Sequence, residues 1–239
     1  MSDSAVGVVG DAEVADRMRS AGHTVTTGTA DAVPDSDTVV AVGREAVSAV
    51  ATAGGDPLVV PVDAGRGLRS VAAEDAPAAV GSLDDARIER HPVFAVRAAG
   101  AAVGTAAFEV TVVTAEAARI SAYAVETPGD TVGRFRADGV TVATPAGSPG
   151  YARRVGGPVV APADAVGVVA PIAPFQTDRD RWVLSLSELS VSVTRDEATV
   201  ALFVDGERAA TVDRGESVSF ERTGTLRVAV GEENRSRYG

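Results

Sequence analysis

The sequence predicts a two-domain protein, with an α/β domain over residues 1–85 and a β-rich domain over residues 86–239. In the first part, short apolar strands alternate with helices, an order typical of a parallel sheet covered on both faces. In the second part, apolar segments are joined by Gly, Pro and Asp turns, which predicts mostly antiparallel β structure. A chain of 239 residues has room for two modest domains or one large one.

The first part begins with a strand over residues 5–9, followed by a helix with Asp11 as its N-cap and Gly22 as its stop. Further strands are expected in HTVTTG, DTVVAVG and PLVVPVD, with a helix in REAVSAVATAGG. Three strands end at a glycine or an aspartate, namely Gly10, Gly43 and Asp63. Open α/β sheets bind ligands at the carboxyl edge of their strands, so a site is expected there.

The second part consists of successive β segments. They are ARIERHPVFAVRAAG, GTAAFEVTVV, ARISAYAVETPGDTVGRFRADG, VTVATP, VLSLSELSVSVTRD, ATVALFVDGERAATV and ESVSFERTGTLRVAV. Asp205 and Gly206 lie between two apolar runs, the residue pair typical of a hairpin turn. The tail EENRSRYG is expected to be frayed.

The charge of the chain restricts its partners. Asp and Glu number 33 against 22 basic residues, a net charge of −11, and every basic residue is arginine. Carboxylates stay hydrated where screening is strong, so this composition suggests a halophilic source with a salt-rich cytoplasm. Non-specific binding to nucleic acid is not expected, because that binding needs a basic face. A phosphate contact has to come from arginine or backbone amides, since there is no lysine.

Other features narrow the class of protein further. The chain has no cysteine, which removes disulfides, thiolate metal sites and cysteine nucleophiles. No apolar run approaches the length of a membrane span, and the acidic start lacks the pattern of a signal peptide. A cytoplasmic protein without a membrane partner is expected. His23 and His91 lie in no ligand spacing, so no protein-held metal site is predicted.

The stretch TPAGSPGYARRVGGPVV, residues 144–160, has the residue types of a ligand-binding turn. It follows an apolar strand, and its glycines allow a ligand to approach backbone N–H groups closely. Just upstream, RFRADG sets two arginines and a carboxylate beside the same strand. Capture of an anion or of a nucleotide's sugar fits these residues, although a β-domain with elaborate turns fits them as well.

The run RADGVTVATPAGSPGYARRVGGPVVAP resembles the substrate-binding signature of NAD kinases, which reads R-x-D-G, an apolar strand, T-P-T-G-S-T-A-Y, then G-G-P. The resemblance covers roughly residues 86–230 and is most specific around 136–158. It implies a Rossmann-like N-terminal domain and a β-rich, β-sandwich-like C-terminal domain. It also implies NAD as substrate, and ATP with a divalent metal such as Mg²⁺, held mainly by phosphate oxygens, to phosphorylate the 2′-hydroxyl of the adenosine ribose. Homodimers or homotetramers are the implied assembly.

Carried over residue by residue, the resemblance assigns NAD binding to Glu109, Arg136, Asp138, Gly147, Ser148, Pro149, Gly150, Tyr151 and Arg154. Glu109 matches the second residue of the family's Asn-Glu pair, while Phe108 replaces the Asn. The Phe108 ring could stack on a base or fill core, and its place on an alternating strand favours core. Tyr151 has a ring suited to packing on a base or ribose. The alternative for Arg136 and Asp138 is a cross-strand ion pair at the surface.

The family's G-G-D-G-T motif is altered here to Gly43-Arg44-Glu45-Ala46-Val47. Glu45 is the candidate base for the ribose hydroxyl, and Gly43 and Arg44 are the candidate contacts to ATP phosphates. Three functions stay open at this point. They are an active NAD kinase, a relative with impaired catalysis that acts as a binding or assembly partner, and a kinase whose Arg153 and Arg154 recognise another anionic acceptor.

Overall fold

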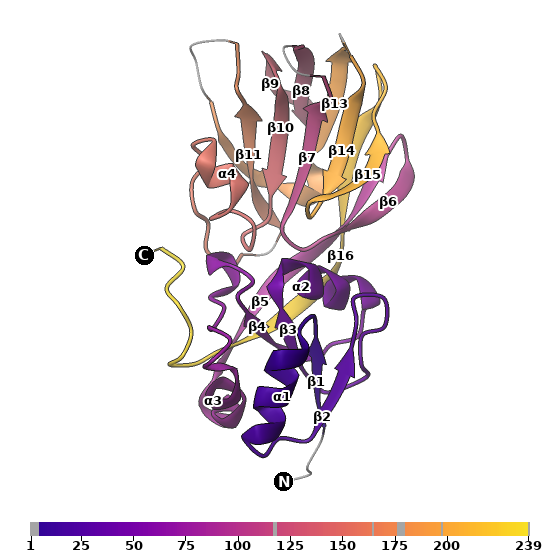
Figure 1. Ribbon diagram of the computed structural model, residues 1–239. Coiled ribbons are helices and arrows are strands. Elements are labelled where there is room, and N and C mark those ends of the chain that lie inside the picture. Colours follow the sequence, from indigo (N-terminus) through magenta and orange to yellow (C-terminus); the bar gives the residue numbers. More distant parts are fainter. Residues whose placement is uncertain (1–4, 117–118, 164, 176–179, 197, 239) are drawn as a thin grey trace. The chain divides into compact units, whose positions relative to one another are not determined.

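The computed structural model describes residues 5–116, 119–163, 165–175, 180–196 and 198–238 (Figure 1). They form two compact units: unit 1 contains residues 1–91 and 224–239, and unit 2 contains residues 92–223. The chain passes from one unit to the other inside two long strands. These are β5 (Arg87–Ala98) and β16 (Ser217–Val230).

Unit 1 is an α/β domain, as the sequence predicts. Its further elements are β1 (Val6–Val9), α1 (Ala12–Ser20), β2 (Val25–Gly28), β3 (Thr38–Val42), α2 (Gly43–Ala53), β4 (Leu58–Val62), the 3₁₀ turns η1 (Arg66–Leu68) and η2 (Leu83–Asp85), and α3 (Ala76–Gly81). The sheet order is β2-β1-β3-β4-β16, and every neighbouring pair in it is parallel. Its core is mainly Val and Ala from the strands and helices.

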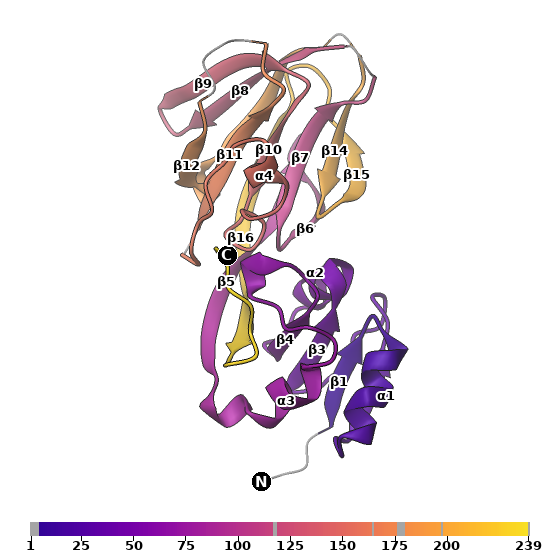
Figure 2. The same ribbon diagram turned by 60° about the vertical axis from the view of Figure 1, so that its left-hand side comes forward.

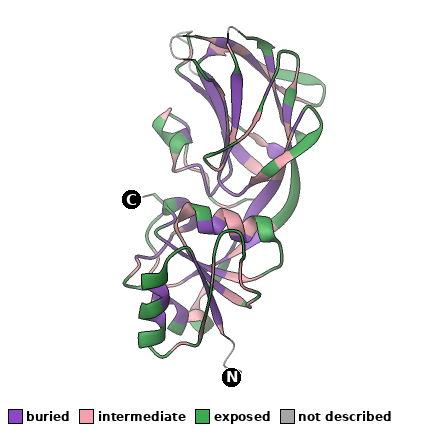
Figure 3. Ribbon diagram, turned by 45° about the vertical axis from the view of Figure 1, so that its right-hand side comes forward, coloured by how far each residue is buried: buried purple, intermediate pink, exposed green. Residues whose placement is uncertain are grey.

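Helix α1 begins and ends at the residues that the sequence predicts, because its N-cap and its terminating glycine are local signals. The Asp11 carboxylate accepts the N–H groups of Glu13 and Val14 at 2.7 and 3.1 Å, which satisfies donors that the first turn leaves free. Gly22 follows the helix with φ +94°, a conformation that glycine adopts without strain. The helix buries one face, including Met18, and exposes the other (Figure 3).

Unit 2 is a sandwich of two β-sheets. Its elements are β6 (Ala101–Ala106), β7 (Glu109–Thr114), β8 (Ser121–Thr127), β9 (Asp130–Ala137), β10 (Gly139–Ala143), α4 (Tyr151–Arg154), β11 (Val166–Ile172), β12 (Trp182–Ser185), η3 (Leu186–Glu188), β13 (Ser190–Arg195), β14 (Val200–Val204) and β15 (Glu207–Thr211). One sheet has the antiparallel order β12-β11-β10-β7-β14-β15 (Figure 2). The other contains β9, β8, β13, the first part of β16, and the β5–β6 hairpin. Apolar side chains from both sheets form one buried core.

Two sequence-based expectations need correction. The boundary between the units falls inside β5 at residues 91 and 92, not at 85, and the last 16 residues belong to unit 1. They belong there because the second half of β16 pairs in parallel with β4, with Arg227 opposite Leu58. The β segment GTAAFEVTVV contains parts of two strands, since β6 ends at Ala106 and β7 begins at Glu109.

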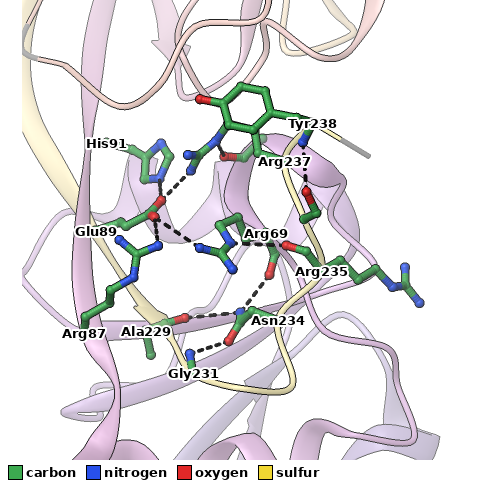
Figure 4. Close-up of polar contacts among 12 residues, drawn as sticks. Arg69, Arg87, Glu89, His91, Ala229, Gly231, Asn234, Arg235, Arg237 and Tyr238 are labelled. Carbon is green, nitrogen blue, oxygen red and sulfur yellow. Dashed lines mark hydrogen bonds and ion pairs between the residues drawn. The ribbon is translucent and has the colours of Figure 1, made fainter.

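Residues 232–238 of the C-terminal tail are tied to unit 1 by hydrogen bonds and an ion pair, so the expectation of a frayed end was wrong for them (Figure 4), while Gly239 lies outside the described residues. Asn234 fastens the start of the tail, because the side-chain amide donates to Arg69 O at 2.7 Å and accepts from Gly231 N at 2.6 Å. Arg237 is 7% exposed, donates to Gly67 O at 3.1 Å, and pairs with the carboxylate of Glu89 on β5. A charged side chain buried with its counter-ion holds the tail in place.

Glu89 lies at the centre of this buried network. Its carboxylate lies 2.7 Å from the Arg87 guanidinium and 3.5 Å from His91 Nε2. Burial raises the pKa of Glu89, but the His91 ring and the guanidinium groups of Arg237 and Arg87 outweigh it and lower that pKa to about 2. Burial lowers the pKa of His91. Glu89 is therefore an ionised group that ties β5 to the tail.

Candidate functional site

The predicted binding stretch follows β10 and is anchored by its first residue, Thr144. The Thr144 backbone N–H donates to Phe108 O at 2.8 Å, and its hydroxyl donates to Ala107 O at 2.6 Å. The Thr144 carbonyl oxygen accepts the N–H groups of Gly147 and Ser148 at 3.1 and 2.8 Å. The turn is thus held by its own backbone and by the residues that separate β6 from β7.

Gly147 and Ser148 are enclosed by protein. A Cβ at Gly147 would overlap the Phe108 carbonyl group, so this close approach requires glycine. The Ser148 side chain is fully buried, and its hydroxyl donates to Pro145 O at 3.0 Å and accepts Val160 N–H at 2.9 Å. The hydroxyl predicted to face a ligand is instead used to close the stretch on itself.

The second half of the stretch reaches solvent. Pro149 and Gly150 are half-buried, Tyr151 is 38% exposed as the first residue of α4, and Arg153 and Arg154 are exposed. Helix α4 lies against β10 and β11 (Figure 2). The Tyr151 ring therefore offers open surface to a flat ligand, while its role in binding stays a prediction.

Of the glycine pair after α4, Gly157 is buried, whereas Gly156 is exposed and lies close to Arg181. Gly157 N–H donates to Ala152 O at 2.8 Å, and a Cβ at Gly157 would lie 2.8 Å from that oxygen. The Arg181 guanidinium donates to Val155 O and would lie 3.0 Å from a Cβ at Gly156. These two glycines allow the chain to turn tightly beneath an arginine.

Glu109 lies beside the predicted stretch. It is the half-buried first residue of β7 and pairs with Ala143, the last residue of β10 before Thr144. The replaced neighbour Phe108 is 1% exposed, which confirms the expectation that it fills core. The structure thus brings Glu109 and the 144–151 stretch to one end of the six-stranded sheet.

Arg136 and Asp138 lie at the other end of β10. Asp138 is exposed and directly precedes β10, whereas the binding stretch follows it. Five strand residues span about 17 Å at about 3.4 Å each, which separates Asp138 from Thr144 within one chain. Arg136 has its guanidinium carbon 5.8 Å from the ring centroid of Phe175, which is 71% exposed. The predicted NAD contacts therefore fall into two groups on unit 2.

The remaining predicted residues lie in unit 1, at the carboxyl ends of its strands. Gly43 has φ +80°, in the left-handed region that favours glycine, and α2 begins at this residue, so the altered motif is helical from Arg44 onward. Glu45 is exposed in the first helical turn, while Ala46 is 2% exposed. Arg44 and Ala46, which replace two glycines of the family's motif, thus lie in a helical turn, and the Ala46 side of this turn is buried.

A cavity of about 560 Å³ adjoins Glu45 in unit 1. It lies where β1, β2 and β3 end, the crevice in which open α/β sheets hold ligands. It is lined by Val8, Val9, Gly10, Asp11, Ala12, Arg19, Thr27, Gly28, Thr29, Ala30, Val42, Glu45 and Ala46. Two of the residues that line the cavity are acidic, Asp11 and Glu45. The Asp11 carboxylate is already used to cap α1.

Sequence reasoning assigned no role in the site to three residues that shape it. Ala107 and Thr144 form the bond between the two segments, and Asp205 holds the backbone of the 107–109 segment from the β14–β15 hairpin. The Asp205-Gly206 pair was recognised as a turn, which it is, with φ +50° and +99°. Nothing in the sequence indicated that the Asp205 carboxylate accepts backbone N–H groups of residues 107–109.

Within the residues that the structure describes, no group of three or more His, Cys, Asp or Glu side chains is arranged to hold a metal ion. None of the helices in the described part of the chain is long and apolar enough to span a membrane.

The fold and the site define a two-domain protein, in which a parallel α/β unit is joined to a β-sandwich unit with a glycine-containing turn at one end of its six-stranded sheet. The family model described as the ATP-NAD kinase C-terminal domain matches residues 108–229, just over half of the chain. The chain therefore belongs to the NAD kinase family, a family of phosphotransferases.

Solved structures of this family share the fold. An NAD kinase from Archaeoglobus fulgidus in complex with ATP is 23% identical, with a TM-score of 0.74 over 95% of this chain and 94% of that one. Yeast NADH kinase complexed with NADH is 16% identical, with a TM-score of 0.77 over 96% of this chain and 84% of that one. No curated protein sequence matches the chain.

Proposed function

We propose that this chain phosphorylates the 2′-hydroxyl of the adenosine ribose of NAD, with ATP and Mg²⁺ as donor. The observation that carries the proposal is the assembly of Glu109, the 144–150 turn and Tyr151 at one end of a sheet within the matched family domain. The ATP and NADH bound to the two relatives support a nucleotide as ligand.

In the proposed reaction, the ribose oxygen attacks the γ-phosphorus of ATP. The bond from that phosphorus to the β,γ-bridging oxygen breaks, ADP leaves, and the hydroxyl proton passes to Glu45. Mg²⁺ bound to the donor neutralises charge on the phosphates. Gly43 and Arg44 are proposed to contact the phosphates. The exposure of Glu45 beside a cavity of ligand size supports a role in contact with substrate.

The test is formation of NADP from NAD, ATP and Mg²⁺ by the full chain in molar KCl. Glu45→Gln should lower the rate by ~10²–10⁴-fold, the usual contribution of a general base, while calorimetry finds NAD affinity nearly unchanged. Glu13→Gln is the matched control, because Glu13 is another exposed glutamate in the first turn of a unit 1 helix. A wild-type rate in Glu45→Gln would overturn the role of Glu45.

A nucleotide-binding relative with impaired catalysis is the second candidate. It is favoured by the helical conformation of residues 43–46, since packed Ala46 replaces a glycine that lets phosphates approach the backbone in the family's motif. Under this alternative, calorimetry detects NAD binding, but no NADP forms above background. Absence of both binding and turnover would contradict both candidates.

A further inference from the structure

We propose that Asp205 is a positioning residue that builds the 144–150 turn from a distance, by holding the segment between β6 and β7. Its Oδ2 accepts Ala107 N–H at 2.9 Å, and its Oδ1 accepts the N–H groups of Phe108 and Glu109, each at 2.8 Å. Its own N–H donates to Glu109 O at 2.8 Å. One side chain thus receives three consecutive backbone donors.

These bonds account for the break between β6 and β7. The N–H groups of residues 107–109 turn toward one carboxylate, an arrangement that a continuous strand with alternating N–H directions cannot make. The carbonyl oxygens of Ala107 and Phe108 accept bonds from Thr144. The segment is therefore bonded on one side to Asp205 and on the other to the start of the predicted binding stretch.

Three of the residues that make these contacts are buried. Ala107 and Phe108 are 3% and 1% exposed, and Thr144 is 2% exposed. Water cannot readily replace a partner at such positions, so loss of the carboxylate leaves buried N–H groups unsatisfied. Gly147 packs directly on the Phe108 carbonyl, so a shift of that carbonyl moves the turn.

The hairpin itself does not require the carboxylate. Asp205 and Gly206 both have positive φ, and Asn or Gly adopts that conformation at the first position readily. Asp205→Gly removes the carboxylate while keeping the turn chemistry. Asp205→Asn also keeps the turn, but it replaces one acceptor oxygen by an NH₂ group that opposes a backbone donor.

Hydrogen exchange tests the positioning role without any ligand. In Asp205→Gly, the amides of residues 107–109, of Thr144 and of residues 146–148 should exchange faster than in the wild type, while the β14–β15 ladder keeps its protection. Glu216→Gln is the matched control, because Glu216 is also a half-buried carboxylate that accepts a backbone N–H in a turn of unit 2, from Asp213 at 2.9 Å. The control should leave residues 144–148 unchanged.

NAD binding provides the second readout, and this part rests on the proposed function. Loss of hydrogen bonds to a charged group should raise the dissociation constant for NAD by roughly 10- to 100-fold in Asp205→Gly and less in Asp205→Asn. Thr144→Val should not add its full effect to that of Asp205→Gly, because the two residues act through the same segment.

The outcomes separate the two proposals. Unchanged exchange at 144–148 in a folded Asp205→Gly or Asp205→Asn chain would overturn the positioning role. An unchanged NAD dissociation constant in a variant whose turn exchanges faster would overturn the link between this turn and binding. Faster exchange in the variants, together with no NAD binding by the wild-type chain, would support the positioning role and overturn the proposed function.

Discussion

Replacing Glu89 by Gln should destabilise unit 1 strongly without changing the size of the side chain. Glutamine resembles the protonated, neutral form of Glu89, and the fold lowers the pKa of this group from 4.5 to about 2. At about 1.4 kcal/mol per pH unit, the ionised form is favoured in the fold by about 3 kcal/mol. This agrees with the roughly 3–5 kcal/mol lost when one partner of a buried ion pair is removed.

The assay is thermal melting of the full chain at several pH values. A loss of about 3 kcal/mol should lower the melting temperature by roughly 6–12 °C at neutral pH. Because the pKa of Glu89 is depressed in the fold, its stabilisation is complete above its ordinary value of 4.5 and is lost as pH falls toward about 2. The difference between wild type and Glu89→Gln should therefore shrink over this range.

Salt and a surface control make the result specific. The network is buried, so the difference should persist in molar KCl, where exposed pairs are screened. Glu13→Gln breaks an exposed pair with Arg17 on α1 and should change stability by only about 0.2–0.5 kcal/mol. If Glu89→Gln melts like Glu13→Gln, or if its deficit is the same at low pH, the assignment of Glu89 as a buried counter-ion is refuted.

Three further predictions concern the surface and the site. The melting temperature of the wild type should rise from low to molar KCl, because salt screens the repulsion of a net charge of −11, and a flat or falling curve would contradict this. The triple change Arg44→Gly, Glu45→Asp and Ala46→Gly restores the glycines and the aspartate of the family's motif and should raise the rate of NADP formation. It should also lower the melting temperature, since each glycine in a helix costs about 1 kcal/mol. An unchanged or lower rate would argue that the altered motif does not limit the reaction. Ser148→Ala should cost about 0.5–1.5 kcal/mol in thermal unfolding because it removes the hydrogen bonds that this buried hydroxyl makes with Pro145 O and Val160 N–H, and full stability would show that the hydroxyl is dispensable.

Much of the fold could be predicted because its signals are local. Asp11 caps the helix that starts at the next residue, and Gly22 follows its end with positive φ. Asp205 and Gly206 form the expected hairpin turn. Each of these signals depends on bonds or backbone angles within a few residues, so the order of residue types is enough to indicate the element.

The candidate site was only partly predictable. The resemblance identified Glu109 and the 144–151 stretch, and their pairing across β7 and β10 lies within one sheet. It did not indicate that the Ser148 hydroxyl is fully enclosed, whereas the separation of Asp138 from the turn by one strand follows from the order of the motif. Burial depends on which segments become neighbours in the fold, and a motif read along one chain does not contain that information.

By itself, the sequence determined the two kinds of domain and the hairpin, and its resemblance to a known signature indicated the family; the role of Glu45 as base stays a prediction. Tertiary structure decided that the tail joins unit 1, through Arg237 and Glu89, which are 148 positions apart. It also decided that Asp205 binds the backbone of residues 107–109, which precede it in the sequence by 96 to 98 positions. The physical reason is the same in both cases. A buried charged group is stable only where the folded chain brings donors or a counter-ion to it, and those partners come from distant segments that no local pattern connects.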